Sequence, residues 1–299
     1  MTTFRKLLID TEQRLSCADV FFGHGYDSAH DEAVALVLAA AELPVDTGAE
    51  ILDLSVAKQA IATLAGYLKR RIENREPVAY IIGQAWLGPL MFKADRRALV
   101  PRSPIMSLIM AGLAPWWQGP DNPEVIVDLC AGGGSIGVLA AEVFPVARLY
   151  LLDIDPSALA LADENIIFHA VSHRVSVIQA DLLAPIAAGT VDVILANPPY
   201  VDQLDMDTLP REYRHEPRHA LAAGVDGLDL VHRIIAEAAL VLRSPGLLVL
   251  EVGNSWPAME AAYPDFAFIW LEIAEGGHGV TVLSADELQR LLVQQQRAQ

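Results

Sequence analysis

The sequence predicts an α/β fold, with a mostly parallel sheet preceded by a small helical domain. Three observations lead to this prediction. Apolar side chains recur at helical spacing up to about residue 75, short apolar strands alternate with helical segments from Glu124 onward, and two apolar pieces near the C-terminus lack a helix between them. Strands that alternate with helices indicate a parallel sheet covered on both faces. The last two pieces predict an antiparallel hairpin that closes the sheet.

The N-terminal region, residues 1–76, contains three stretches with apolar residues at helical spacing. They span Leu7–Leu15, Val34–Ala41 and Ile61–Leu68, and glycines or Pro44 separate them. This periodicity predicts three helices that form a small domain of their own.

Residues 77–110 differ from both of their neighbours. Prolines and glycines punctuate short apolar pieces there, such as Val78–Ile82 and Leu90–Phe92. Such punctuation is typical of turns, so we expect a hairpin-rich linker. Residues 111–299 then form the third unit, which contains the sheet.

Within that third unit, short apolar runs predict the strands, and helical periodicity predicts the connections between them. The predicted strands are Val125–Leu129, Leu149–Leu152, Val175–Ile178, Val191–Ala196 and Leu247–Glu251. The predicted helices are Ser135–Phe144, Ser157–His169 and Leu228–Leu242. The closing hairpin is predicted from Phe266–Leu271 and Val280–Leu283.

Composition excludes several classes of protein. No apolar run approaches the roughly 20 residues that a membrane-spanning helix needs, and no apolar segment follows the charged N-terminus. We therefore expect a soluble protein without a signal peptide. The chain has 2 cysteines, too few for a disulfide framework or a cysteine zinc site, which fits a reducing cytoplasm.

The formal net charge of −17 argues against nucleic acid as the main partner, because phosphates would be repelled. It suits a basic partner instead. Acidity that only keeps the protein soluble explains the charge equally well. The sequence leaves the oligomeric state open.

A glycine-rich loop joins the first predicted strand to the helix that follows. It reads Asp128-Leu129-Cys130-Ala131-Gly132-Gly133-Gly134-Ser135-Ile136-Gly137. Ligands bind beyond the carboxyl ends of parallel strands, so this is where a site is expected. The glycines satisfy both the dinucleotide-binding fingerprint and the nucleophile elbow of serine hydrolases. The pattern alone leaves these alternatives open, together with a turn that binds nothing.

Two acidic residues on the following strands favour a ligand that contains adenosine. Asp153 ends the second strand, where a carboxylate can accept hydrogen bonds from ribose hydroxyls. Asp181, which precedes Leu182, ends the third strand region and is placed to meet an adenine edge. A hydrolase needs neither feature. Each aspartate alone is also compatible with a helix N-terminus or a turn.

The tetrapeptide Asn197-Pro198-Pro199-Tyr200 follows the fourth predicted strand and lies at the same edge of the sheet. An amide nitrogen is a poor nucleophile, because its lone pair is delocalised into the carbonyl. Two acceptors, the Asn197 side-chain oxygen and the Pro198 carbonyl, can hold the two N–H donors of a carboxamide. Consecutive prolines stiffen that carbonyl, and Tyr200 can stack on the flat amide. A simple Asn-Pro turn is the alternative.

Together, the loop at 128–134, the acidic Asp153 and the Asn-Pro-Pro-Tyr tetrapeptide resemble class I, Rossmann-like methyltransferases that modify planar nitrogens. Three further segments, Pro77–Ile81, Asp95–Arg102 and Ala223–Leu228, are similar to the protein-glutamine N5-methyltransferases. The resemblance implies S-adenosyl-L-methionine as the cofactor, no metal, and a helical domain that helps recognise a protein substrate.

On this resemblance we assign three sets of site residues. The cofactor-binding set is Asp128, Cys130, Ala131, Gly132, Gly133, Gly134, Asp153, Asp181, Leu182 and Asn197. The catalytic set is Asn197, Pro198 and Tyr200. The substrate-binding set is Asn197, Pro198, Pro199 and Tyr200.

The family has a branch that modifies peptide chain release factors and one that modifies ribosomal protein L3 of the large subunit. Leu209–Pro217 and Glu251–Ser255 resemble the ribosomal-protein branch, whereas Pro101–Ile105 departs from the pattern usual in the other. Ala131 and Gly133 stand where the ribosomal-protein branch usually has Thr and Ser, which removes a hydroxyl contact and keeps the loop small. The resemblance implies ribosomal protein L3, a basic substrate, with release factors as the alternative.

Other patterns in the chain carry weaker signals. His215–His219 matches a zinc-protease string, but Pro217 interrupts the helix which that motif needs. The roles of Arg214 and Arg218 stay open. An NAD-dependent dehydrogenase that uses the same glycines and a silent adenosine-binding module are the rival functions.

Two side-chain clusters are expected to be structural. Arg70, Arg71 and Arg75 are predicted to lie on a solvated helix face. Trp116 and Trp117 are predicted to be half-buried packing at a domain seam.

Overall fold

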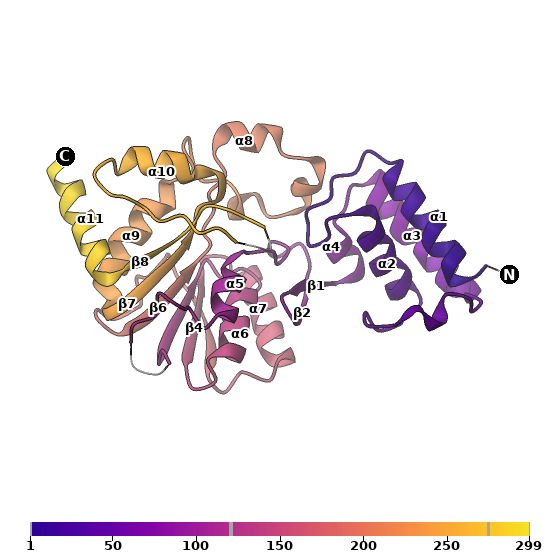
Figure 1. Cartoon of the computed structure of the whole chain (residues 1–299), viewed down its shortest axis with the longest axis horizontal. Coiled ribbons are helices and arrows are strands. Elements are labelled where there is room, and N and C mark those ends of the chain that lie inside the picture. Colours follow the sequence, from indigo (N-terminus) through magenta and orange to yellow (C-terminus); the bar gives the residue numbers. More distant parts are fainter. Residues whose placement is uncertain (1, 120–121, 274–275, 299) are drawn as a thin grey trace.

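The computed structural model describes residues 2–119, 122–273 and 276–298. The helices nearest the N-terminus lie at one end of the molecule, and the sheet with its flanking helices forms the larger part at the other end (Figure 1). A small two-stranded hairpin lies between these parts.

The N-terminal part contains α1 (Phe4–Ser16), α2 (Ala29–Ala40), the 3-10 turn η1 (Ala49–Ile51), α3 (Lys58–Glu73) and the short α4 (Val78–Ile82). The three predicted helices are therefore present. Thr3 and Ser28 cap α1 and α2, because their side chains accept hydrogen bonds from first-turn N–H groups. The apolar stripes meet in one core, which includes Leu15, Leu36 and Leu64, each at most 2% exposed.

The segment that follows contains the expected hairpin. Strands β1 (Gln84–Leu87) and β2 (Leu90–Lys93) pair antiparallel across the Gly88-Pro89 turn, and α5 (Ile105–Met110) follows. Residues 78–82 are helical rather than extended, since α4 docks on the helical core through Val78 and Ile81.

The main sheet has six strands in the order β5-β4-β3-β6-β7-β8. Their bounds are β3 (Val125–Leu129), β4 (Arg148–Asp153), β5 (Val175–Gln179), β6 (Val191–Ala196), β7 (Leu242–Glu251) and β8 (Val280–Ser284). All pairs are parallel except β7 with β8. This confirms the mostly parallel sheet with an antiparallel C-terminal end. All five strands predicted for the parallel part are present, and β7 begins earlier than predicted.

Helices cover both faces of this sheet. One core lies between the sheet, α5, α6 (Ser135–Val143) and α7 (Pro156–Phe168). The other lies between the sheet, α9 (Asp229–Val241), α10 (Trp256–Ala262) and α11 (Ala285–Ala298). Short elements bridge β6 and α9: α8 (Gln203–Thr208), η2 (Arg211–His215) and η3 (Arg218–Ala220), while η4 (Gly253–Ser255) follows β7. None of the helices in the described ranges combines the length and the apolar character of a membrane-spanning segment.

The C-terminal hairpin forms in a shorter version than expected. β8 pairs with β7 over its whole length, but only Trp270 of the predicted Phe266–Leu271 strand forms a bridge, to Thr281. Phe266, Phe268 and Trp270 instead contact one another in a row and pack on the core beside α9 and α10. Side-chain packing thus replaces most of the backbone ladder there.

The basic cluster at the end of α3 corrects part of the expectation of a solvated face, since Arg70 is 39% exposed but Arg71 and Arg75 are mostly covered. The Arg71 side chain is 1% exposed and binds the buried carboxylates of Glu32 and Glu212. Arg75 is also mostly covered, with 11% of its side chain exposed. These arginines are covered because η2, which is distant in the sequence, lies against this face of α3. Trp116 and Trp117 are partly buried and pack against the sheet core, which confirms the packing, while their place at a domain seam stays a prediction.

Candidate functional site

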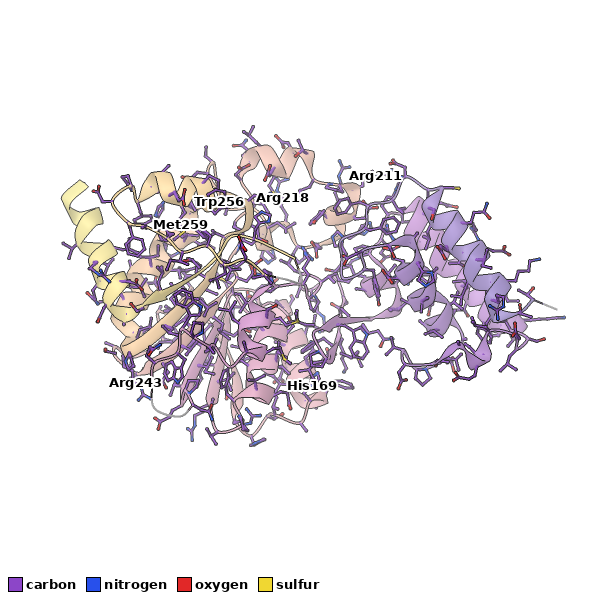
Figure 2. The ribbon with its side chains drawn as sticks, viewed as in Figure 1. His169, Arg211, Arg218, Arg243, Trp256 and Met259 are labelled. Carbon is purple, nitrogen blue, oxygen red and sulfur yellow. The ribbon has the colours of Figure 1, made fainter. Side chains whose placement is uncertain are left out.

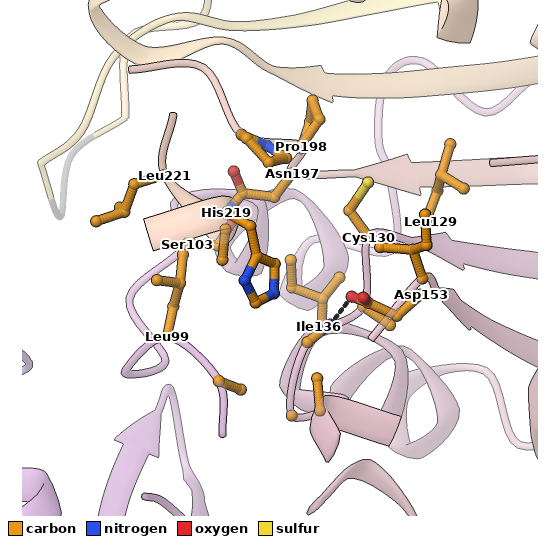
Figure 3. Close-up of a pocket in the computed structure, with 18 of the residues that line it drawn as sticks. Leu99, Ser103, Leu129, Cys130, Ile136, Asp153, Asn197, Pro198, His219 and Leu221 are labelled. Carbon is orange, nitrogen blue, oxygen red and sulfur yellow. Dashed lines mark hydrogen bonds between the residues drawn. The ribbon is translucent and has the colours of Figure 1, made fainter. Parts of the chain in front are cut away.

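A cavity lies at the carboxyl ends of β3, β4 and β6, the edge at which the sequence places its motifs (Figure 3). Most of the predicted site residues line it: Cys130, Ala131, Gly132, Gly133, Asp153, Asp181, Leu182, Asn197, Pro198, Pro199 and Tyr200. Asp128 and Gly134 do not. The fold therefore brings the glycine loop and the tetrapeptide, separated by more than sixty positions, to one hollow.

The glycine loop forms the floor of this cavity and is fixed by Asp153. The Gly132 N–H donates to Asp153 Oδ2 at 2.8 Å, and the Asp155 N–H donates to Oδ1 at 2.9 Å. Gly132 and Gly134 adopt φ values of 53° and 78°, the left-handed region that favours glycine. A Cβ on Gly134 would lie 2.9 Å from Leu151, so the loop packs too closely on the sheet for a side chain there.

Asp128 and Gly134 belong to the loop but do not line the cavity. Asp128 is fully buried, and its Oδ2 accepts the Gly137 N–H at 2.8 Å, while its Oδ1 has no partner among the described residues. Burial raises the pKa of the Asp128 carboxyl to about 8. Gly134 is the N-cap of α6. These positions shape the loop, and their part in cofactor binding stays a prediction.

Asp181 and Leu182 lie at the rim. The Asp181 side chain is 59% exposed and forms an ion pair with Arg233 at 3.0 Å. Leu182 adopts a φ of 53° and is buried. Nearby, Ile154, Ala180 and Leu230 supply an apolar wall. This part of the cavity therefore combines a carboxylate at the surface with apolar sides.

The tetrapeptide forms the opposite wall. Asn197 directly follows β6, and Figure 3 shows it across the hollow from Asp153, with Cys130 between them. Tyr200 is held further along, where its hydroxyl donates to Glu251 Oε1 at 3.0 Å. Burial, and then the nearby Glu251 charge, raise the pKa of Tyr200 above its usual value.

Several lining residues were not assigned a role from the sequence. Glu251 is 4% exposed, and its Oε2 accepts the Ser103 hydroxyl at 2.6 Å. Arg102 also lines the cavity. Glu251 could have been found by a sequence signal, because it ends an apolar strand at the same sheet edge. Ser103 and Arg102 lie in the linker and carry no such signal.

The zinc-protease string is broken as its proline predicts. His215 ends η2 and His219 lies on η3, so the two imidazoles do not share one helix. Glu216 is buried and binds Arg102 through both carboxylate oxygens, at 2.6 and 2.8 Å. Burial disfavours its charge, but Arg102 outweighs that effect and lowers the pKa of Glu216 to about 2. His219 reaches the mouth of the cavity, where its Nε2 lies 3.1 Å from Asp155 Oδ2.

Arg211 and Arg218 lie on the segment between the sheet and the helical part, as Figure 2 shows. Arg214 and Arg218 are both exposed to solvent.

Comparison with known proteins identifies the family. The methyltransferase small domain family model matches residues 118–269. The ribosomal protein uL3 glutamine methyltransferase of Bordetella pertussis is 43% identical over 96% of this chain and 97% of its own length. The protein of the same name from Francisella tularensis is 41% identical over 96% of this chain and 91% of its own.

The chain belongs to the ribosomal protein uL3 glutamine methyltransferase family. Among solved structures, the hMettl16 catalytic domain in complex with the MAT2A 3'UTR hairpin 6 matches with a TM-score of 0.52. It is 15% identical and covers 77% of this chain and 84% of that chain. At this identity the likeness shows the shared Rossmann-like fold alone.

The residues of the cavity fit the adenosyl part of S-adenosyl-L-methionine. The Asp153 carboxylate keeps acceptor capacity beyond its two backbone bonds, which suits ribose hydroxyls. The wall formed by Ile154, Ala180 and Leu230 suits a flat base, with Asp181 at the rim for an exocyclic amine. Gly132 and Gly133 line the cavity without side chains, so the loop backbone can approach a ligand there.

Proposed function

We propose that this chain transfers a methyl group from S-adenosyl-L-methionine to the side-chain amide nitrogen of a glutamine in ribosomal protein uL3. The observation that carries the proposal is the shared cavity, because the glycine loop and Asn197 line the same hollow. The names of the relatives support the choice of uL3. The net charge of −17 suits a basic ribosomal protein.

The two sides of the cavity, the glycine loop and the tetrapeptide, would have different roles. Gly132, Gly133, Asp153 and Asp181 would hold the cofactor, which supplies an electrophilic methyl group when bound. The Asn197 side-chain oxygen and the Pro198 carbonyl would accept the two amide hydrogens of the glutamine. These fixed dipoles also stabilise the positive charge that grows on the nitrogen as its lone pair localises. The proton then leaves after transfer, so no residue has to remove it first.

Methyl labelling of purified uL3 tests this proposal. The wild-type chain should incorporate label from S-adenosyl-L-methionine into one tryptic peptide, and mass spectrometry should place the methyl group on a glutamine. Asn197→Ala should lose about 100-fold or more in rate, the size expected for a lost preorganised dipole, while it still binds the cofactor in calorimetry. Asn74→Ala, at an exposed helix end, is the matched control and should remain active.

Three results would contradict the proposal. Full activity of Asn197→Ala would remove the assigned role of that side chain. Methyl label in a release factor and none in uL3 would show that the substrate is a release factor. Binding of NAD without binding of S-adenosyl-L-methionine would support a dehydrogenase.

A further inference from the structure

The last residue of β7 and the residues directly after it contact Tyr200 at three separate points. The Glu251 carboxylate accepts the Tyr200 hydroxyl at 3.0 Å. The Ser255 hydroxyl donates to the Tyr200 backbone carbonyl at 2.7 Å. Gly253 lies against the ring, where a Cβ would come within 2.3 Å of Tyr200 Cε2. One short stretch of chain therefore restrains the hydroxyl, the ring and the backbone of the same tyrosine.

Strand pairing places this segment beside the tetrapeptide. Ala196 of β6 pairs with Leu250 of β7 in parallel register, so the next residues along each strand, Asn197 and Glu251, emerge side by side. Glu251 is in turn paired with Val280 of β8, which holds its backbone from the other side. The carboxylate thus projects from a rigid sheet position rather than from a loop.

The second oxygen of Glu251 is also occupied. It accepts the Ser103 hydroxyl at 2.6 Å, and Ser103 Oγ receives the Ile105 N–H at 3.3 Å. Burial raises the pKa of Glu251, although the hydrogen bonds from Ser103 and Tyr200 act against this rise. A buried carboxylate is costly unless its hydrogen bonds are satisfied, and here both oxygens have a donor. An apolar side chain would fill this space without that cost, but it could not hold the tyrosine hydroxyl.

We propose that Glu251 is a positioning residue for methyl transfer, which acts through Tyr200 by holding its hydroxyl so that the ring keeps one orientation in the amide pocket. This inference rests on the proposed function and deepens it. With its hydroxyl committed to Glu251, Tyr200 presents its ring to the substrate carboxamide. Glu251 is assigned no proton transfer, because in the proposed reaction the proton leaves only after the methyl group has been transferred.

A double-mutant cycle with Glu251→Leu and Tyr200→Phe tests the proposal. Glu251→Leu should lower kcat by about 100-fold, the size of a 1 Å misplacement, while the Kd for S-adenosyl-L-methionine stays within about twofold. Glu251→Gln keeps an acceptor for the hydroxyl and should recover most of that loss. In the Tyr200→Phe background, Glu251→Leu should lower kcat little further, because the hydrogen bond between the tyrosine hydroxyl and Glu251 is already absent. Glu260→Leu is the matched control, since it removes an exposed carboxylate bound to Trp270.

Two kinetic outcomes would overturn the proposal. If Glu251→Gln is as slow as Glu251→Leu, the charge of the carboxylate is needed, and Glu251 acts as a proton acceptor. If Glu251→Leu lowers kcat as much in the Tyr200→Phe background as in the wild type, Glu251 does not act through Tyr200.

A measurement without turnover separates this inference from the proposed function. In the ¹³C-tyrosine NMR spectrum, the Tyr200 ring signal is assigned from its absence in Tyr200→Phe. It should shift in Glu251→Leu and stay near its wild-type position in Glu251→Gln. An unchanged signal in Glu251→Leu would refute the restraint, whether or not the wild type methylates uL3. Cofactor binding by each variant shows that it is folded.

Discussion

Replacing Arg71 with methionine should destabilise the protein by about 3–5 kcal/mol, the range expected when one partner of a buried ion pair is removed. The Arg71 guanidinium donates to Glu32 at 2.7 and 2.9 Å, to Glu212 at 3.0 Å and to the Phe21 carbonyl at 2.7 Å. The side chains of Arg71, Glu32 and Glu212 are 1%, 4% and 3% exposed. Methionine keeps the length of the side chain but leaves two carboxylates buried without their shared cation.

The assay is thermal and denaturant unfolding of the full chain, followed by circular dichroism. A loss of about 4 kcal/mol corresponds to a Tm decrease of about 8 °C, at the roughly 2 °C per kcal/mol typical of long chains. The deficit should also depend on pH. Without Arg71, burial raises the pKa of both carboxyls in the folded state, and stability is then lost as pH rises through those values. The variant should therefore fall further below the wild type at pH 8 than at pH 5.

Arg5→Met is the matched control, because it makes the same substitution in the same helical region. Arg5 binds Asp53 at 3.0 Å, but their side chains are 53% and 83% exposed, so solvent screens the pair and the midpoint should not change. The reasoning about the buried cluster fails if Arg71→Met is no less stable than Arg5→Met, or if its deficit is the same at both pH values.

Three more predictions follow from the site and its supports. The pKa of Asp128 is raised to about 8, so its contribution to stability is lost as pH rises from about 4 to 8. In urea unfolding, the free energy of unfolding should therefore fall less between pH 5 and pH 8 in Asp128→Asn than in the wild type. Glu216 behaves in the opposite way, because its pKa is lowered to about 2. Its contribution of about 3 kcal/mol to the stability of the wild type should be lost as pH falls from 4.5 to 2, and an equally steep acid transition in Glu216→Gln would contradict this. Gly134→Ala and Gly189→Ala each place alanine at positive φ, at a cost of about 1–3 kcal/mol. Only Gly134→Ala should also weaken cofactor binding in calorimetry, because its Cβ would lie 2.9 Å from Leu151, whereas Gly189 has no atom within 4 Å among the described residues.

The sequence by itself determined the fold class and most of the sheet. Strand β6 is the clearest case, because all six of its residues are buried and all but Asp192 are apolar. Both faces of a parallel strand are covered, so its sequence records burial directly. The glycine loop and the tetrapeptide were placed at one edge by the same logic, since parallel strands all end on the same side. The C-terminal helix α11 was not predicted from its periodicity.

Only the tertiary structure decided how distant polar residues pair. Arg71 looks like a surface residue in its own helix, and it is buried because Glu212, 141 positions later, lies against that helix. Glu251 acquires its partners in the same way, since Ser103 is 148 positions before it and Tyr200 is 51 positions before it. Apolar periodicity is a local property of each segment, so a sequence displays it. A buried hydrogen bond depends on two segments that meet only after the chain has folded, and neither segment alone records where its partner will be.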